Sequence, residues 1–583
     1  MKKRIRLSNE NKEDQWFDYE CVLFRRNVRK CLRKYRKTLL ETDRHEYCKL
    51  RREYKNLILC KKKAFRNTLF EKITAVTNQN DFWQKIKDVL RKKSYNRNKI
   101  SLDSWFTHFK DVLEKHENNV TDDATNANEI NDTIDKEYID VLDRPISKTD
   151  VLKAMHKLKN NKASGPDGMI GEFFKFSSEI ISDYLVALSN HLFDNGFYPD
   201  DWCESIILPL FKKGNFNDPN NYRGISLCNI ASKLYSSIIN DRLKCWIDNN
   251  NLTEEYQAGF KSGYSTIDHI FTLLALVQKQ FDNIRNRKLY VAFIDFQKAF
   301  DTVSRKLLWP ILIKNKIHGK LLNCIKSMYA DVKAKVRAGA KFTDFVNCTE
   351  GVKQGDVCSP LLFSLFINEL ALEIIHKGRH GIKLAPDTLE LFILLFADDI
   401  VLVSETVVGL QTQLNNLHSA ASKLNLTVNL AKSNVLVFRL GGFLGEMETW
   451  FYAGKRMEVV NGYKYLGIYF SSKLSFSHAC QDLVARAKRA TSCILNALYK
   501  FDKVSGPVFL KLFDCQVKPI LLYGAEVWGL MSGNAIECDH LFALKRLLGV
   551  DRRTPNAFVY GEYARYPLYI DAYTRLLNIG LNW

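Results

Sequence analysis

The chain has 583 residues, a formal net charge of +21, and 46% hydrophobic and 26% charged residues. This composition is that of a globular protein, and the length should divide into three or four subdomains rather than form one small core. The basic excess favours a polyanionic partner, although charge alone does not separate nucleic acid from an anionic membrane.

The chain has 14 cysteines, and none of them forms a C-x-x-C pair. This pattern is typical of reduced intracellular cysteine and does not support a zinc knuckle. The N-terminus lacks a signal-peptide pattern, and no uncharged apolar run is long enough to span a bilayer. We therefore expect a soluble protein of the nucleus or cytoplasm that does not engage a membrane.

The basic excess is concentrated in the first hundred residues. Residues 11–94 show helical spacing with basic faces and recurring aromatic side chains, so one face can pack while the other contacts phosphates. A solvated basic helix pair is the alternative, but we predict nucleic-acid contact. The acidic residues 117–143, rich in Asn, Asp and Thr, then predict a flexible linker.

Structure resumes at Ile146, where a capped start predicts an amphipathic helix over Val151–Leu158. A dense turn signal follows, and a second helix is expected over Glu172–Phe193. Residues 205–227 then predict a hairpin that places Lys213 and Arg223 near each other across its two strands. Such a pair suits a triphosphate, since Arg can contact phosphate through two nitrogens and Lys as a point charge. The alternative is that Lys213 and Arg223 are ordinary surface charges on a loop.

Residues 256–266 form a basic loop punctuated by glycines, before a helix expected over Thr266–Gln280. The loop lacks the G-x-x-x-x-G-K-[ST] pattern, so it is not a P-loop. We predict instead that the glycines let the backbone approach a nucleic-acid strand.

The run of apolar and aromatic residues that begins at Leu289 ends at Asp295 and is typical of a buried strand. A turn should then lead into a helix that runs through Leu308. Phe300 lies five residues after Asp295, close enough to lie under the sugar of a bound nucleotide. Asp301 we interpret as a helix cap rather than as a third metal ligand.

Gly351–Asp356 interrupts a strand pattern before an apolar helix expected over Ser359–Ile375. Gly355 would let the backbone approach a base pair closely. The amide of Gln354 offers both donors and an acceptor.

Asp398 and Asp399 lie between two apolar runs, where carboxylates are costly to bury unless a cation compensates them. The sequence FADD fits the tip of a tight hairpin with strands Leu391–Leu395 and Ile400–Val403. An Asp-Asp pair standing alone would be interpreted as a surface turn, but the apolar flanks favour a Mg²⁺ site that Asp295 closes. Two such ions stabilise the attacking and leaving oxygens of an in-line displacement, so nucleotidyl transfer is the reaction class indicated.

A helix is expected over Thr406–Leu424, a short hairpin at Gly462–Gly467, and a helical pattern from Ser477 onward. No internal repeat is detected.

In this order, the motifs resemble the polymerase of the non-LTR (LINE-type) retrotransposons, a reverse transcriptase. FIDFQKAFD and FADD resemble the two catalytic motifs, and GVKQGDVCSPLLF resembles the template and nucleotide-contact motif. NYRGISL resembles the fingers motif and QAGFKSGYST an insertion typical of the group. LYGAEVWG and KRLLGVDRRTPNAFVYGE resemble the region that follows the palm. The resemblance covers about residues 146–583.

The resemblance implies a role for each matching residue. Asp295, Asp398 and Asp399 would bind the metals, and Phe300 would be the steric gate that excludes a ribose 2′-OH. Arg223 and Lys213 would hold the triphosphate, Gln354 and Gly355 would line the nascent base pair, and Lys432 would be the general acid for pyrophosphate. The primer grip would be formed by Tyr463, Lys464, Tyr465, Leu466 and Gly467.

The implied fold class is α+β: a right-hand polymerase fold with fingers, a palm with an antiparallel sheet, and a helical thumb, preceded by a basic α-helical N-terminal extension. The expected domains are the extension at 1–116, an acidic flexible linker at 117–145, fingers and palm at 146–470, and the thumb and C-terminal region at 471–583. The implied cofactor is two Mg²⁺ ions, with Mn²⁺ as a possible substitute. The implied partners are an RNA template, a DNA primer or target, and dNTPs. The oligomeric state is left open.

Nothing in the sequence resembles the endonuclease that autonomous members of this family carry, so we expect a polymerase region without it. A group II intron maturase or a telomerase-like protein is the nearest alternative, and the FADD motif with the 257–266 insertion favours the non-LTR class. A catalytically silent or domesticated RNA-binding derivative is the alternative from another class. Retention of all three aspartates argues against it.

Overall fold

The structure is a computed structural model, and it describes residues 16–75, 100–114, 139–283, 288–385, 389–498, 506–529 and 533–582. Contacts between residues divide the chain into two units. One unit is formed by residues 95–478, and the other by residues 1–94 together with residues 479–583.

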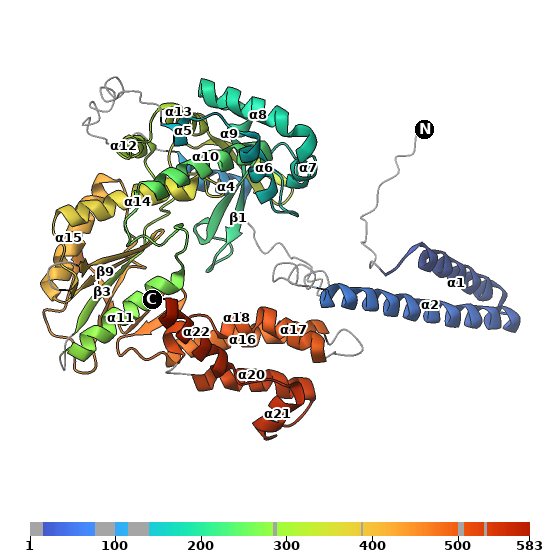
Figure 1. The fold of residues 1–583 in the computed structure, drawn as a ribbon. Coiled ribbons are helices and arrows are strands. Elements are labelled where there is room, and N and C mark those ends of the chain that lie inside the picture. The colour runs from blue at the N-terminus through green and yellow to red at the C-terminus, as the bar shows by residue number, and fades with distance from the viewer. Residues whose placement is uncertain are drawn as a thin grey trace. The chain divides into compact units, whose positions relative to one another are not determined.

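Two long basic helices begin the described chain, α1 (Tyr19–Thr38) and α2 (Glu41–Thr74). They lie side by side and antiparallel (Figure 1), because Lys61 late in α2 contacts Asp18 at the start of α1, with Nζ 2.7 Å from Oδ2. The side chain of Asp18 also caps α1 by accepting from the main-chain nitrogen of Cys21. The predicted helical pattern is confirmed by α1 and α2, and residues 11–15 and 76–94 lie outside the described residues.

A four-stranded sheet opens the unit of residues 95–478, with the strand order β2-β1-β4-β5. Strands β1 and β2 are antiparallel, and β1 and β4 are parallel. The strands are β1 (Glu204–Phe211), β2 (Tyr222–Cys228), β4 (Lys333–Ala338) and β5 (Lys341–Asn347), and a short 3-10 helix, η2 (Pro219–Asn221), joins the first two.

Helix α4 (Leu102–Leu113) packs on this sheet, so the domain boundary predicted after residue 116 is wrong. Trp105 and Phe109 of α4 share a buried cluster with Ile207 of β1. The ring of Phe109 lies so close to Gly224 of β2 that a Cβ there would be 2.7 Å from it. Burial of these two aromatic rings ties the helix to the sheet, although its sequence neighbours belong to the basic segment.

The prediction of an acidic flexible linker at 117–145 is wrong at its C-terminal end. Residues 115–138 lie outside the described residues, but α5 (Asp140–Asp143) is helical, and Leu142 and Asp143 are buried. Leu142 belongs to the main apolar core, which outweighs the acidic composition around it.

Helices pack around the four-stranded sheet and around a second, five-stranded sheet of this unit (Figure 1). Helix α6 has the predicted capped start, because Ser147 and Asp150 form a reciprocal capping box. The helix predicted over Glu172–Phe193 is two helices separated at Ser177. The helices of this part are α6 (Lys148–Lys157), α7 (Gly171–Phe176), α8 (Ser178–Asn195), α9 (Asp200–Cys203), α10 (Ile230–Asn249) and α11 (Thr266–Asn283).

A five-stranded sheet has the order β13-β10-β3-β9-β8, and its central strand β3 is buried along its whole length. Neighbouring strands are antiparallel except β10 and β13, which are parallel. The strands are β3 (Leu289–Ile294), β8 (Ile393–Phe396), β9 (Asp399–Ser404), β10 (Asn434–Phe438) and β13 (Glu458–Val460). Three two-stranded ribbons accompany it: β6 (Ile382–Ala385) with β7 (Leu389–Leu391), β11 (Phe451–Tyr452) with β12 (Lys455–Arg456), and β14 (Gly462–Tyr465) with β15 (Ile468–Ser471).

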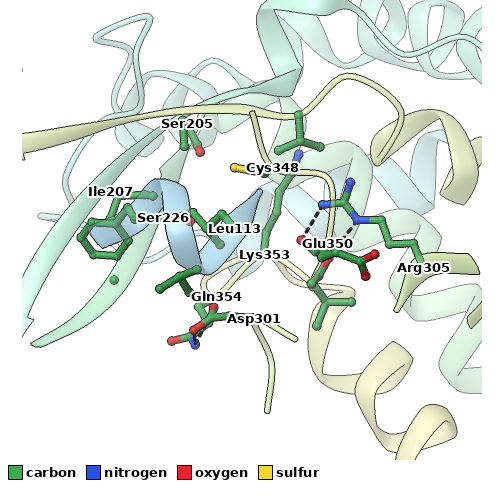
Figure 2. A pocket seen from close by; sticks show the side chains of 17 residues that line it. Leu113, Ser205, Ile207, Ser226, Asp301, Arg305, Cys348, Glu350, Lys353 and Gln354 are labelled. Carbon is green, nitrogen blue, oxygen red and sulfur yellow. Dashed lines mark hydrogen bonds between the residues drawn. The ribbon is translucent and has the colours of Figure 1, made fainter. Parts of the chain in front are cut away.

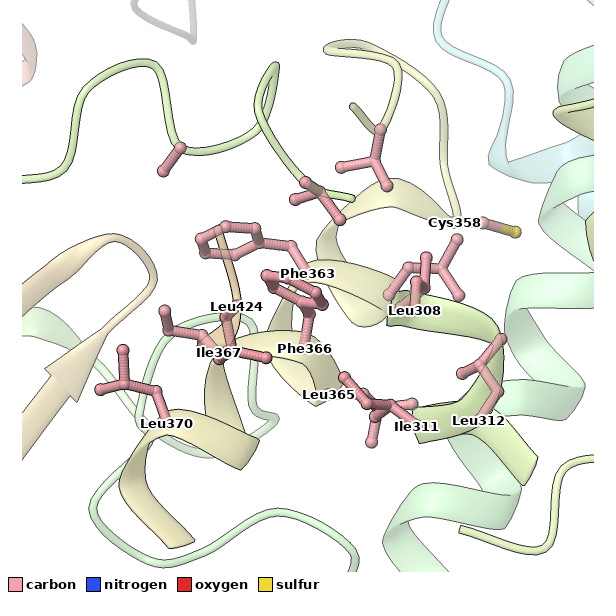
Figure 3. Packing of buried hydrophobic residues seen from close by; sticks show 14 of the residues in the cluster. Leu308, Ile311, Leu312, Cys358, Phe363, Leu365, Phe366, Ile367, Leu370 and Leu424 are labelled. Carbon is pink, nitrogen blue, oxygen red and sulfur yellow. The ribbon is translucent and has the colours of Figure 1, made fainter. Parts of the chain in front are cut away.

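Helix α14 (Ser359–His376) lies in the main core, where Phe363, Phe366 and Leu370 pack with Leu308 of α12 and with Leu424 (Figure 3). By length and composition alone, α14 is apolar enough to cross a membrane. Its burial accounts for that apolar character, because core helices share the same composition. The other helices here are α12 (Arg305–Lys314), α13 (Gly319–Met328) and α15 (Val407–Lys423).

The C-terminal part is helical as predicted. Leu541, Leu544 and Val559 form its own buried cluster, and α22 contacts both α19 and α20. The helices are α16 (Ser477–Leu498), α17 (Gly506–Gln516), α18 (Lys518–Leu521), α19 (Ala525–Trp528), α20 (Gly533–Leu548), α21 (Asn556–Tyr563) and α22 (Leu568–Asn582).

Candidate active site

The three predicted aspartates lie at one end of the five-stranded sheet. Asp295 directly follows β3, and Asp399 is the first residue of β9. Because Ile294 pairs with Ile400 in the antiparallel register, Asp295 and Asp399 are neighbours across the two strands. Asp398 lies in the two-residue turn between β8 and β9. The predicted hairpin is therefore present in the structure.

The site concentrates negative charge. The pKa of Asp399 is raised to about 6, first by burial and then by the charges of Asp398 and Asp295. The ammonium group of Lys432 opposes this shift, and its Nζ donates to Oδ2 of Asp295 at 3.1 Å. Among the described residues, no three histidine, cysteine or acidic side chains are grouped closely enough to hold a metal ion as they stand. Three neighbouring carboxylates with one ammonium group nevertheless have the chemistry of a divalent-cation site.

The loop after α15 holds the end of β3 in place. The main-chain nitrogen of Asn429 donates to the carbonyl oxygen of Asp295 at 2.7 Å, and the main-chain nitrogen of Asp295 donates to Oγ of Ser433 at 3.0 Å. Both contacts come from residues that flank Lys432. The same loop therefore positions the backbone of Asp295 and the cation that contacts its side chain.

A cleft with a volume of about 580 Å³ opens in front of these aspartates. It is lined by side chains from both sheets and from α4, so distant parts of the sequence meet there. The residues that matter for its chemistry are Lys212, Arg223, Asp295, Phe300, Asp301, Gln354, Asp398 and Lys432.

The lysine in this cleft is Lys212 rather than the predicted Lys213. Arg223 pairs with Leu210 across the two strands, and the chain continues beyond β1 so that the main-chain nitrogen of Lys212 donates to the carbonyl oxygen of Asn221. Burial and the neighbouring charge of Arg223 lower the pKa of Lys212, while Asp295 and Asp398 oppose the shift. Both lysines are exposed, but Lys213 does not line the cleft. Strand alternation could have found Lys212, because it shares a face with Leu210, the partner of Arg223.

Phe300 lines the cleft, and its ring stacks on Phe363 of α14 with centroids 4.3 Å apart. The turn that carries it is longer than predicted, because α12 begins at Arg305 with Ser304 as its N-cap residue. Asp301 is therefore not a helix cap. Its two carboxylate oxygens instead accept from Nε2 of Gln354, each at 2.9 Å.

Gln354 lines the cleft, whereas Gly355 does not. Gly355 has φ +120°, and a Cβ there would lie 2.7 Å from the carbonyl oxygen of Ser226 in β2. A glycine is needed here for a close approach between protein backbones, and the approach of Gly355 to a base pair stays a prediction.

The loop before α11 has an unexpected role. Gln257 is fully buried, and its Oε1 accepts from the main-chain nitrogens of Gly259 at 2.8 Å and Ala397 at 3.2 Å. Ala258 and Tyr256 exchange main-chain hydrogen bonds with Leu395 of β8. The segment thus supports the aspartate hairpin. Gly259 lies against Ala397, and the approach of the loop glycines to nucleic acid stays a prediction. The sequence contains no signal for this pairing.

The predicted hairpin at 462–467 is present as β14 and β15, with Leu466 and Gly467 in its turn at positive φ. The ring of Tyr463 stacks on Phe293 of β3 with centroids 4.2 Å apart, and burial raises its pKa to about 12. Tyr463 also donates through its hydroxyl to the carbonyl oxygen of Lys432. Lys464 is exposed and Tyr465 is buried. The hairpin therefore lies next to the aspartates, and its contact with a primer stays a prediction.

Residues 211–470, which include most of the elements around this site, match the family model described as "Reverse transcriptase (RNA-dependent DNA polymerase)". The chain is 26% identical over 396 residues to a probable RNA-directed DNA polymerase from transposon BS of Drosophila melanogaster, which covers 67% of this chain and 43% of that protein. It is 27% identical over 433 residues to the Pol polyprotein of the type-1 retrotransposable element R2 of Popillia japonica, which covers 72% of this chain and 57% of that protein.

The chain is thus related to the reverse transcriptases of non-LTR retrotransposons, as its motifs predicted. It spans about half the length of the curated relatives it matches. Among solved structures, a Candida albicans telomerase in complex with a fragment of telomeric RNA matches with a TM-score of 0.37 and 11% identity, over 63% of this chain and 67% of that one.

Proposed function

We propose that this chain is an RNA-directed DNA polymerase that extends a primer 3′-OH with dNTPs on an RNA template. The observation that carries this proposal is that one cleft holds two of the predicted aspartates, Asp295 and Asp398, together with basic side chains and the ring of Phe300, and that Asp399 is the neighbour of Asp295 across the two strands. The primer 3′-oxygen would attack the α-phosphorus, and the bond from that phosphorus to the bridging oxygen would break to release pyrophosphate. Catalysis of this kind depends mainly on positioning and charge stabilisation.

In this proposal the fold is that of a right-hand polymerase. The five-stranded sheet with α12–α15 would be the palm, the four-stranded sheet with α4 and α6–α10 the fingers, and α16–α22 the thumb. The basic helices α1 and α2 would contact nucleic acid, because their exposed lysines and arginines can neutralise phosphates.

Asp295, Asp398 and Asp399 would hold two Mg²⁺ ions, for which Mn²⁺ could substitute. Burial and then repulsion by Asp398 and Asp295 raise the pKa of Asp399, and this supports the assignment because a bound cation would compensate the buried negative charge. When bound, such ions supply charge neutralisation at the attacking and leaving oxygens.

Lys212 and Arg223 would contact the triphosphate, with Lys213 as the weaker candidate. Phe300 would exclude a ribose 2′-OH, and Gln354 would line the nascent base pair. Lys432 would protonate the departing pyrophosphate, for which its ammonium group must turn away from Asp295. Residues Tyr463–Gly467 would grip the primer beside the aspartates. The protein would act on RNA and DNA in the nucleus and cytoplasm, away from membranes.

The test is primer extension on a poly(A)-tailed RNA with dTTP and Mg²⁺. Asp398→Asn should lower the extension rate by about 1,000-fold, since one preorganised charge at the reacting centre is lost. RNA binding should stay within about twofold, because Asp398 is not part of a basic surface. Asp344→Asn, on the exposed strand β5, is the matched control and should extend primers like the wild type. Undiminished extension by Asp398→Asn would sink the metal assignment.

A catalytically silent RNA-binding derivative is the second candidate, favoured by the exposed basic faces of α1 and α2. The same assay separates the two functions. Tight RNA binding by a wild-type chain that extends no primer, with Mg²⁺ or Mn²⁺, would support the derivative.

A further inference from the structure

Another acidic side chain of the cleft, Asp301, is separate from the three aspartates of the proposed metal site. It lies on the turn that follows β3, and burial raises its pKa to about 6. Lys298 of the same turn, Arg223 of β2 and Lys212 act on its charge, but in the described part of the chain no lysine or arginine nitrogen forms an ion pair with it. Its direct partner is the side-chain amide of Gln354.

This contact fixes which end of the Gln354 amide can serve a ligand. A carboxylate accepts hydrogen bonds, so the amide nitrogen must face Asp301. The acceptor Oε1 is then the end of Gln354 that remains for a nucleotide in the cleft. Figure 2 shows the side chains of Asp301 and Gln354 side by side at the edge of a small pocket that adjoins the cleft.

The backbone around this pair links the turn of Phe300 to the loop of Gln354. The main-chain nitrogen of Val352 donates to the carbonyl oxygen of Phe300 at 2.8 Å, and that of Gly351 donates to Val303 at 2.8 Å. The carbonyl oxygen of Gln354 accepts from the main-chain nitrogen of Ser226 at 2.8 Å. Ser226 lies on β2, the strand that also carries Arg223.

A buried arginine fixes the same loop from behind. Arg305 donates to the carbonyl oxygens of Tyr329 at 2.8 Å, Gly351 at 3.0 Å and Glu350 at 3.2 Å. Its guanidinium group therefore has carbonyl oxygens rather than a carboxylate as partners (Figure 2). With the loop backbone fixed in this way, the orientation of the Gln354 side chain depends on Asp301.

We propose that Asp301 is a positioning residue for the incoming nucleotide, which holds the Gln354 amide so that its oxygen faces the nucleotide. This inference rests on the proposed polymerase function. Asp301 acts through Gln354 and does not contact the nucleotide. A purely structural role does not explain a carboxylate at this position, because burying its charge lowers the stability of the fold and a neutral side chain would not.

The test measures binding of dTTP to the full chain on a poly(A) RNA template with a dideoxy-terminated primer, together with the kcat and KM of single-nucleotide extension. Asp301→Leu should weaken dTTP binding and raise KM by about tenfold, the effect of losing one charge-assisted hydrogen bond, with kcat changed by less than about threefold. Asp301→Asn should restore most of the affinity, because its amide oxygen can accept from Gln354. The melting temperature should not fall in either variant, because a buried charge is removed.

A double-mutant cycle separates positioning from a general effect. In a Gln354→Ala background, Asp301→Leu should weaken dTTP binding no further. Asp143→Asn is the control, since it removes another buried carboxylate of the same unit, far along the chain from the cleft, and should leave dTTP binding unchanged. Three outcomes would each overturn the inference. Asp301→Leu could lower the dTTP affinity equally with and without Gln354, it could leave dTTP binding unchanged, or the wild type could bind no dTTP. Tight dTTP binding without extension would count against the proposed function alone.

Discussion

Gln257 accepts a hydrogen bond from the main-chain nitrogen of Ala397 at 3.2 Å, and so a loop about 140 residues earlier in the chain holds the turn that presents Asp398. Ala397 has φ +56°, a conformation that a non-glycine residue adopts only at some cost. The hydrogen bond, with the main-chain pairing of Tyr256 and Ala258 to Leu395, helps to offset that cost. To support this turn, the backbone of the loop that carries Gln257 must come very close to the backbone at Ala397.

Gly259→Ala tests that approach. A Cβ on Gly259 would lie 2.2 Å from the main-chain nitrogen of Ala397, so the hairpin or the loop must move. We expect a loss of about 1–3 kcal/mol in the free energy of unfolding, and a fall in extension rate of about 100-fold from the displaced aspartates. Urea unfolding and primer extension measure the two effects. Gly441→Ala is the control, because nothing lies within 4 Å of its Cβ position. Wild-type behaviour of Gly259→Ala would contradict the support role.

Two adjacent lysines give a paired prediction. Lys212→Ala should raise the KM for dNTP by about tenfold, because a charge-assisted contact to the triphosphate is lost. Lys213→Ala should change it by less than about twofold, since an exposed charge outside the cleft contributes little. Steady-state extension with varied dTTP measures both. If Lys213→Ala raises the KM for dNTP more than Lys212→Ala does, Lys213 is the triphosphate contact, as the sequence predicted.

Phe300→Val tests the sugar gate. The smaller side chain leaves space beside Phe363, so a ribose 2′-OH would fit. Incorporation of rNTP relative to dNTP should rise by about 10- to 100-fold, the range expected when a steric block in a pocket is removed. Competition between UTP and dTTP on a poly(A) template measures the ratio. If the ratio does not change, Phe300 only packs against Phe363.

The helical C-terminal part yields a pH-dependent prediction at Asp539 of α20. This residue is 1% exposed, neither of its carboxylate oxygens has a hydrogen-bond partner in the part of the chain that the structure describes, and burial raises its pKa from 3.8 to about 6. The native state therefore binds this proton more tightly than the unfolded state does. As pH rises from about 4 to about 6 the free energy of unfolding falls, and above about 6 the full cost of the buried charge remains.

Asp539→Asn should accordingly raise the free energy of unfolding at pH 7.5 by about 1–3 kcal/mol, with a smaller gain at pH 5. Urea unfolding at the two pH values measures it. Glu562→Gln, an exposed position on α21, should change neither value. A gain that is equal at both pH values would show that ionisation of Asp539 is not the cause.

Sequence alone located the features that rest on local pattern. The hairpin of Asp398, the strand that ends at Asp295 and the hairpin at 462–467 were all predictable, since each depends on an apolar run and a turn signal a few residues long. Local pattern gave a wrong prediction at Asp301. The short turn before α12 suggested that Asp301 caps the helix, but the helix begins four residues later.

Other assignments depend on how separate segments pair. Whether Lys212 or Lys213 enters the cleft depends on the exact register of β1 and β2, and a shift of one residue exchanges the two faces of a strand. The close approaches of Gly259 to Ala397 and Gly355 to Ser226 join residues more than a hundred positions apart.

The sequence by itself determined which aspartates are candidates for the chemistry, because buried carboxylates within apolar runs and family motifs are local properties of the chain. Only the tertiary structure decided how those residues are held. Gln257, Arg305 and Asp301 act through backbone atoms and side chains supplied by other segments, and packing and hydrogen bonding between segments leave no pattern in the neighbouring sequence.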